Sequence, residues 1–271
     1  MKQGLTRHSE RSARIQIDGE ALRHNLGRVK AYAPSSRVMA VIKANAYGHG
    51  VFSAASYLDA ADAFALAMPA EAVALRRAGC SRPLVVLQGF ANQEELKLCA
   101  KYELQPVIHQ QWQAELLYSA SRFSLDVWLK IDTGMHRLGV PPEAVDQAYQ
   151  TLKSAAVVHS IRFMSHFANA DDPDHALNNN QLELFINVIS KYEAERSIAN
   201  SAAVISNAGS QLDWVRPGIM LYGSSPLLER CAEELDLRTV MQFESRIAAI
   251  QHVRKCESIG YGSTWQCPED M

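Results

Sequence analysis

The chain lacks the features that mark several classes of protein. Its five cysteines are odd in number and widely spaced, and they form no C-x-x-C pair. This argues against a disulfide scaffold and a structural zinc site, and it predicts a reduced, cytoplasmic protein. The histidines include no H-E-x-x-H spacing, so we expect no metal centre. No apolar run approaches the ~20 residues that a membrane helix requires.

An excess of charge of one sign is also missing. The net charge is −2 and the isoelectric point lies near 6.5, so we expect neither a nucleic acid nor a membrane surface as a partner. Residues 1–14 are polar and basic, without the apolar core of a signal peptide, and we expect a flexible tail. The hydrophobic content of 48% is sufficient for a large core.

Short apolar runs rich in β-formers alternate with helical patterns from residue 38 to 223. The runs are 38–42, 64–68, 84–88, 106–108, 125–131, 158–166, 197–200 and 214–223. Most are continuously apolar, as in strands that are covered on both faces. This series predicts an α/β fold, a (β/α)8 or TIM-type barrel. An open doubly wound sheet is the alternative, but no G-x-G-x-x-G follows the first run.

The pattern changes near residue 236. The segment TVMQFESRIAAIQHV (239–253) has the composition of an extended strand, and no helical pattern follows it. Residues 236–271 are too few for a complete β domain. The predicted organisation is therefore a tail (1–14), a barrel (15–235) and a truncated, mostly β C-terminal domain (236–271).

Polar residues follow the predicted strands at their carboxyl ends, where barrels place their active sites. They are Lys43, then Lys130, Asp132, His136 and Arg137, then His166, then Asn200 and Ser201, and finally Arg216 and Gly218. Each has an ordinary alternative. Lys43 could be a solvated strand end, Asn200 a helix N-cap, and His166 a hydrogen-bonded core histidine.

Together these residues predict a site for a phosphate-bearing aldehyde. A neutral lysine such as Lys43 is a nucleophile toward an aldehyde, and burial lowers its pKa. Barrels bind phosphate after their last two strands, where Ser201 and Gly218 stand. Lys130 lies inside an apolar run, where a cation is costly unless it is paired or modified. Pyridoxal 5'-phosphate (PLP), held as a Schiff base, satisfies these requirements.

Five segments resemble the alanine racemase family, and they occur in the family's order. They are AVIKANAYGHG, LKIDTGMHRLGV, MSHFANAD, SIANSAA and DWVRPGIMLYG. The resemblance spans residue 15 to about 265. It implies a PLP-dependent isomerase that interconverts L-alanine and D-alanine. It also implies a homodimer in a bacterial cytoplasm that supplies D-alanine for peptidoglycan.

The resemblance also implies roles for individual residues. Lys43 would carry the PLP aldimine and act as one base, and Tyr261 would be the second base, acting in the other subunit's site. The expected phosphate contacts are Tyr47, Ser201, Gly218, Ile219 and Tyr222. Arg216 would face the pyridine nitrogen with His166 behind it. Arg137 would contact the cofactor and substrate, supported by Asn200 and oriented by a carbamylated Lys130.

Two other functions remain open from the sequence. The chain could racemise another amino acid, or it could be a PLP-binding barrel without racemase activity. In the family, the later part of the β domain closes the partner's active site. For a truncated chain we therefore expect cofactor binding by the barrel, and doubtful full turnover.

Overall fold

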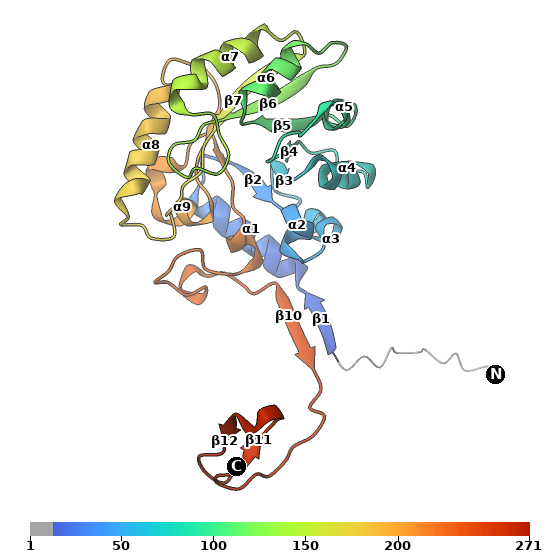
Figure 1. The fold of residues 1–271 in the computed structure, drawn as a ribbon, viewed down its shortest axis with the longest axis vertical. Coiled ribbons are helices and arrows are strands. Elements are labelled where there is room, and N and C mark those ends of the chain that lie inside the picture. The colour runs from blue at the N-terminus through green and yellow to red at the C-terminus, as the bar shows by residue number, and fades with distance from the viewer. Residues whose placement is uncertain (1–12) are drawn as a thin grey trace, which may run out of the picture. The chain divides into compact units, whose positions relative to one another are not determined.

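The computed structural model describes residues 13–271, which form two compact units (Figure 1). One unit is Ile17–Met241, and the other combines residues 13–16 with Gln242–Met271. The predicted tail, residues 1–14, lies outside the described residues as far as residue 12. Within the described part of the chain, no helix has the length and apolar character that crossing a membrane requires.

The larger unit is a closed barrel of eight parallel strands, which confirms the predicted TIM-type fold. The strands are β2 (Arg37–Val41), β3 (Ala63–Leu66), β4 (Leu84–Val86), β5 (Leu104–Ile108), β6 (Leu125–Lys130), β7 (Val158–Met164), β8 (Arg196–Ser197) and β9 (Trp214–Val215). Each strand pairs with the next along the chain. The barrel closes where β2 pairs with β9, with Arg37 beside Trp214 and Val38 beside Val215.

Helices cover the outside of the barrel (Figure 1). They are α1 (Gly19–Tyr32), α3 (Val51–Tyr57), α4 (Pro69–Arg77), α5 (Gln93–Lys101), α6 (Gln111–Tyr118), α7 (Val145–Ser154), α8 (Ala176–Ile189) and α9 (Ser201–Ser206). The short element α2 (Lys43–Tyr47) follows β2 and is not a right-handed helix. Helix α1 precedes the first barrel strand. It begins where the Asp18 carboxylate accepts the backbone N–H groups of Glu20 and Ala21.

The strands are continuously apolar because both of their faces are buried. Met39 and Val41 of β2 belong to the core inside the barrel, whereas Val38 and Ala40 belong to the layer between strands and helices. Two tryptophans, Trp128 and Trp214, meet edge to face inside the barrel, with ring centroids 6.0 Å apart. Because side chains fill the interior, a ligand can enter only at the ends of the strands.

A charged cluster lies near the amino-terminal ends of the strands. The Glu195 carboxylate accepts hydrogen bonds from Arg162 Nε at 2.8 Å and Trp214 Nε1 at 2.9 Å, and it pairs with Arg37. Burial raises the pKa of Glu195, but these donors outweigh burial and hold the pKa at about 2. The cluster joins β2, β7 and β9 at the end of the barrel opposite the predicted site.

Replacing Glu195 with glutamine should lower the free energy of unfolding by about 1–2 kcal/mol at neutral pH. A depressed carboxyl pKa gives stability that is complete above the unfolded value of 4.5 and is lost as pH falls toward about 2. The difference between wild type and variant should therefore shrink over that range. Urea unfolding at a series of pH values measures it, and a difference independent of pH would contradict this account.

The smaller unit contains short pieces of β-structure. Strand β1 (Ala13–Ile17) pairs with β10 (Met241–Ser245), and Arg14 forms an ion pair with Glu244 at 2.6 Å. Strands β11 (Ser258–Ile259) and β12 (Trp265–Gln266) form an antiparallel pair. The extended strand expected over 239–253 is regular only in β10. Beyond Ser245 the segment contains no regular strand, although Val253 exchanges two backbone hydrogen bonds with Met271, at 2.8 and 3.0 Å.

Candidate active site

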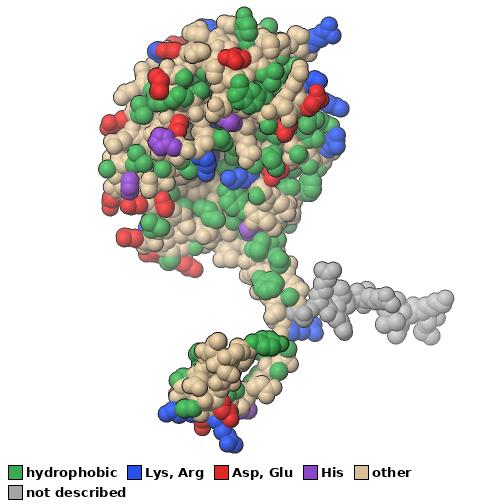
Figure 2. Space-filling view, viewed as in Figure 1, with side chains coloured by type: hydrophobic (Ala, Val, Ile, Leu, Met, Phe, Trp, Pro, Cys, Tyr) green, Lys and Arg blue, Asp and Glu red, His purple; other side chains and the backbone are tan. Residues whose placement is uncertain are grey.

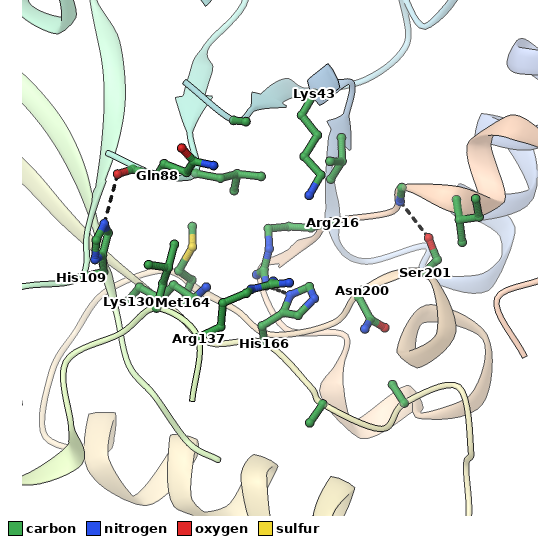
Figure 3. Close-up of a pocket in the computed structure, with 18 of the residues that line it drawn as sticks. Lys43, Gln88, His109, Lys130, Arg137, Met164, His166, Asn200, Ser201 and Arg216 are labelled. Carbon is green, nitrogen blue, oxygen red and sulfur yellow. Dashed lines mark hydrogen bonds between the residues drawn. The ribbon is translucent and has the colours of Figure 1, made fainter. Parts of the chain in front are cut away.

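A cavity of about 780 Å³ lies at the carboxyl ends of the barrel strands. Figure 2 shows a hollow in the barrel, with basic side chains inside it. Most of the predicted site residues line the cavity, and Figure 3 shows several of them converging. The predicted residues that line it are Lys43, Tyr47, Lys130, Arg137, His166, Asn200, Ser201, Arg216, Gly218 and Ile219. Figure 3 labels all of these except Tyr47, Gly218 and Ile219. The structure thus brings together residues from five separate strand ends.

Lys43 opens a turn of unusual handedness. The next four residues, Ala44 to Tyr47, all have positive φ, between 52° and 55°. None of them is glycine, so each costs about 1–2 kcal/mol relative to the right-handed conformation. Such strain is kept where the surrounding structure enforces it, and it is common at functional sites. In Figure 3 the Lys43 amine points from this turn into the cavity, toward Arg216.

A carboxylate outside the turn accepts a hydrogen bond from one of the turn's backbone N–H groups. The Glu71 carboxylate accepts the N–H of Ala44 at 2.8 Å and the N–H of Ala67 at 2.8 Å. Within the segment, Asn45 Oδ1 accepts the N–H of Val51 at 2.9 Å. These bonds tie the turn to the end of β3 and to the start of α3.

Two hydroxyl groups meet the backbone at Gly218. Ser201 Oγ accepts the N–H of Gly218 at 2.8 Å. A Cβ atom at position 218 would lie 2.6 Å from the Tyr47 hydroxyl, so only glycine leaves this space open. Asn200 caps α9, since its Oδ1 accepts the N–H of Ala203 at 3.1 Å. The ordinary N-cap interpretation of Asn200 is therefore correct, and Asn200 also lines the cavity.

Arg216 is buried and lines the cavity. Its Nη1 donates to Ser197 Oγ at 2.5 Å, and its Nη2 donates to the carbonyl of Ser165 and contacts His166 Nδ1 at 3.2 Å. Its Nε makes no hydrogen bond to any residue that the structure describes. Burial lowers the pKa of Arg216 to about 10, which leaves it a cation at neutral pH. Burial, and to a smaller extent the neighbouring cation of Arg216, holds the pKa of His166 well below its usual value. His166 is therefore neutral.

Lys130 is the last residue of β6 and is only 8% exposed. Its amine makes no hydrogen bond within the described part of the chain. Burial, and then the nearby cations of Arg216 and Arg137, lower the pKa of Lys130 to about 7. A substantial fraction of this amine is therefore neutral, and hence nucleophilic, at physiological pH.

The loop after β6 presents Arg137. The Asp132 carboxylate accepts the N–H groups of Gly134, Met135 and His136 at 3.0 to 3.1 Å, which closes a tight turn. Burial raises the pKa of Asp132, but hydrogen bonds from His136 and Gly134 outweigh it and lower the pKa. Asp132 is thus engaged by the backbone of the turn and by His136 Nδ1, at 3.1 Å. The charged side chains that line the cavity are four cations, Lys43, Lys130, Arg137 and Arg216, and one acid, Asp171. His136 is exposed and does not line the cavity.

One wall of the cavity contains polar residues that sequence reasoning did not single out. They include Gln88, His109 and Gln113. His109 Nε2 lies 3.1 Å from the carbonyl of Gln88 (Figure 3). Gln88 and His109 directly follow or end predicted strands, so the rule that selected Lys43 could also have found them. Gln181 of α8 gave no such signal. It is fully buried, accepts the N–H of Ala168 at 3.0 Å, and donates to the carbonyl of His166 at 3.1 Å.

Two of the residues to which the family resemblance assigns roles do not line the cavity. Tyr222 lies behind Tyr47, with ring centroids 4.7 Å apart, and its hydroxyl donates to the carbonyl of Val41 at 3.0 Å. Tyr261 begins a short 3-10 helix, Tyr261–Ser263, in the smaller unit, where its side chain is fully exposed. In the described residues, no three His, Cys, Asp or Glu side chains gather as a metal site would require.

Comparison with known proteins identifies relatives over nearly the whole chain. The family described as "Alanine racemase, N-terminal domain" matches residues 17–226. The alanine racemase of Nitrosococcus oceani is 47% identical over 257 residues, which cover 94% of this chain and 72% of that protein. The alanine racemase of Halorhodospira halophila is 45% identical, with 96% of this chain and 72% of that protein covered.

Solved structures agree with these relatives. The biosynthetic alanine racemase of Pseudomonas aeruginosa superposes with a TM-score of 0.92 at 39% identity, covering 96% of this chain and 73% of that one. The alanine racemase of Bartonella henselae, solved with covalently bound pyridoxal phosphate, gives a TM-score of 0.84 at 25% identity, covering 96% and 73%. The fold, the order of the strand-end motifs and these identities lead to one assignment: the chain belongs to the alanine racemase family.

Proposed function

We propose that this chain binds PLP through Lys43 and interconverts L-alanine and D-alanine. One observation carries the proposal. Lys43 lines the same cavity as Tyr47, Ser201 and Gly218, where the Ser201 hydroxyl bonds the Gly218 N–H and the Tyr47 hydroxyl lies close to Gly218. To bind covalently, a phosphorylated aldehyde requires an amine near its carbonyl and a separate site for its phosphate.

The residues present fit the cofactor. In this assignment the Tyr47 and Ser201 hydroxyls and the backbone of Gly218 and Ile219 would hold the phosphate. The unbonded Nε of Arg216 would be available to the ring nitrogen, and Arg137 would contact the phenolic oxygen and the substrate. The cations of the cavity favour a phosphorylated anion. PLP, when bound, supplies an electron sink that acidifies the α-hydrogen of an amino acid.

Racemisation needs a proton removed from one face of the α-carbon and a proton returned on the other. Lys43 serves one face, as a base when its amine is neutral and as an acid when it is protonated. We assign the other face to Tyr261 of a second copy, so that the enzyme works as a homodimer. In the described residues the cavity contains one tyrosine, Tyr47, whose hydroxyl is directed at Gly218. The Tyr261 side chain is exposed, which leaves it able to reach a partner.

Lys130 should carry a carbamate. The ammonium first loses a proton, and the neutral amine then adds to carbon dioxide and releases a second proton. Overall, a cation is replaced by an anion beside Arg137 and Arg216. Because the pKa of Lys130 is about 7, the neutral amine and hence carbamylation should increase as pH rises through that value. Carbon-13 NMR with labelled bicarbonate should show a carbamate signal that is absent from Lys130→Met. An identical signal in the variant would place the modification elsewhere, and no signal in wild type would refute it.

Chiral chromatography of L-alanine, L-serine and L-lysine, each incubated with the chain and PLP, tests the proposed activity. D-alanine should form fastest. Faster formation of D-serine or D-lysine would support a racemase for another amino acid. Bound PLP without formation of any D-amino acid would support a PLP-binding barrel. In the proposed role, the product supplies peptidoglycan synthesis in a bacterial cytoplasm.

A further inference from the structure

The strained turn after Lys43 requires support from outside itself, and the segment that follows β9 provides it. We propose that Tyr222 is a positioning residue that fixes both Lys43 and Tyr47 in their working positions. The inference rests on the proposed function, since it concerns how the PLP site is held. Tyr222 is 5% exposed and ends a short 3-10 helix, Ile219–Tyr222, directly after Gly218.

The Tyr222 hydroxyl acts at the lysine end of the site. Regular pairing at the closure of the barrel stops at Val38 and Val215. Beyond that point, the N–H of Val41 donates to the carbonyl of Pro217 at 2.9 Å, and the carbonyl of Val41 accepts the Tyr222 hydroxyl at 3.0 Å. Burial raises the pKa of Tyr222, so the hydroxyl stays protonated and remains a donor. The backbone two residues before Lys43 is therefore fixed on both of its polar groups.

The Tyr222 ring acts at the phosphate end. It stacks on Tyr47 with ring centroids 4.7 Å apart, and it packs against His49 in a tilted arrangement with centroids 4.6 Å apart. His49 Nδ1 lies 3.0 Å from the carbonyls of Ala46 and Tyr47, within the left-handed turn. Aromatic pairs of this kind contribute about 0.5–1.5 kcal/mol beyond the area that they bury. The ring thus holds Tyr47 against Gly218, where its hydroxyl bounds the phosphate space.

These two roles predict different effects for two substitutions. Tyr222→Phe keeps the ring and loses the bond to Val41, which leaves a buried carbonyl unsatisfied. Condensation of the Lys43 amine with an aldehyde, which releases water, should then slow about tenfold for both PLP and pyridoxal. The preference for PLP over pyridoxal, which lacks the phosphate, should not change, because Tyr47 is still held.

Tyr222→Leu also removes the ring. Tyr47 then loses its support, so the preference for PLP over pyridoxal should fall by about tenfold, in addition to the slower condensation. Absorbance on mixing gives the rates, and titration with each aldehyde gives the affinities. Neither readout depends on catalytic activity. If Tyr222→Leu fails to fold, the Tyr222→Phe result decides the proposal.

Tyr149 provides the matched control, since its ring lies in a similar cluster with Phe163 and Tyr192 on the outer side of the barrel, at centroid distances of 5.8 and 4.3 Å. Tyr149→Phe and Tyr149→Leu should leave the rates and the PLP preference unchanged. Folded Tyr222 variants with wild-type rates and preference would overturn the proposal while leaving the proposed function intact. Wild-type protein that takes up no PLP would overturn both.

Discussion

Lys43→Ala should abolish racemisation, lowering the rate by more than about a thousandfold. The variant loses both the amine that binds the aldehyde and the base that serves one face of the α-carbon. The other lysine that lines the cavity in the described residues, Lys130, extends from a different strand, β6, and is assigned the carbamate. The visible absorbance that wild type retains after gel filtration with PLP should also disappear.

Lys97→Ala is the control for this experiment. Lys97 lies exposed on α5, where it pairs with Glu94 at 2.7 Å. This variant should bind PLP and racemise alanine as wild type does. Borohydride reduction followed by peptide mass analysis should find the cofactor on Lys43 in both wild type and Lys97→Ala. Retention of PLP and activity by Lys43→Ala would show that another residue carries the chemistry.

Gly218→Ala should weaken PLP binding by about a hundredfold while the protein remains folded. The added methyl group would lie 2.6 Å from the Tyr47 hydroxyl and 3.7 Å from Val41 Cβ. Position 218 has a φ of −124°, outside the left-handed region that favours glycine. The Tyr47 hydroxyl must move, and the methyl group occupies space assigned to the phosphate. Losing one good phosphate contact and blocking another costs roughly 3 kcal/mol, which is about a hundredfold in affinity.

Gly27→Ala separates this effect from a general intolerance of alanine. Gly27 lies within α1, and a Cβ there would meet nothing within 4 Å. This control should bind PLP normally and should unfold at a slightly higher denaturant concentration, since alanine favours a helix by up to about 1 kcal/mol over glycine. For Gly218→Ala, PLP titration and urea unfolding should give weak binding with near-normal stability. Normal binding would refute the phosphate assignment.

The barrel could be predicted because its strands leave a strong signal. A strand covered on both faces, such as β2 or β4, is continuously apolar, and the residue that ends it stands out when it is charged. Lys43 and Lys130 were predicted on this basis, and both line the cavity. The same rule would predict Gln88 and His109 as residues of the cavity, since they also stand at strand ends.

Other features of the site could not be read from the sequence. The left-handed turn consists of Ala44, Asn45, Ala46 and Tyr47, and three of these four residues have no local preference for positive φ. Its conformation is imposed by distant partners, including Glu71 and Tyr222. Tyr222 was expected to contact the phosphate, whereas the structure places its hydroxyl on a backbone carbonyl. Such roles depend on which segments the fold brings together.

In the proposed reaction, a proton leaves the α-carbon on one face and another returns on the other. Incubating L-alanine with the chain and PLP in deuterium oxide measures this exchange. The D-alanine that forms should carry deuterium at the α-position, as chiral chromatography with mass detection would show, and Lys43→Ala should form none. L-alanine recovered without conversion to D-alanine would contradict the proposed reaction, whether or not it carried deuterium.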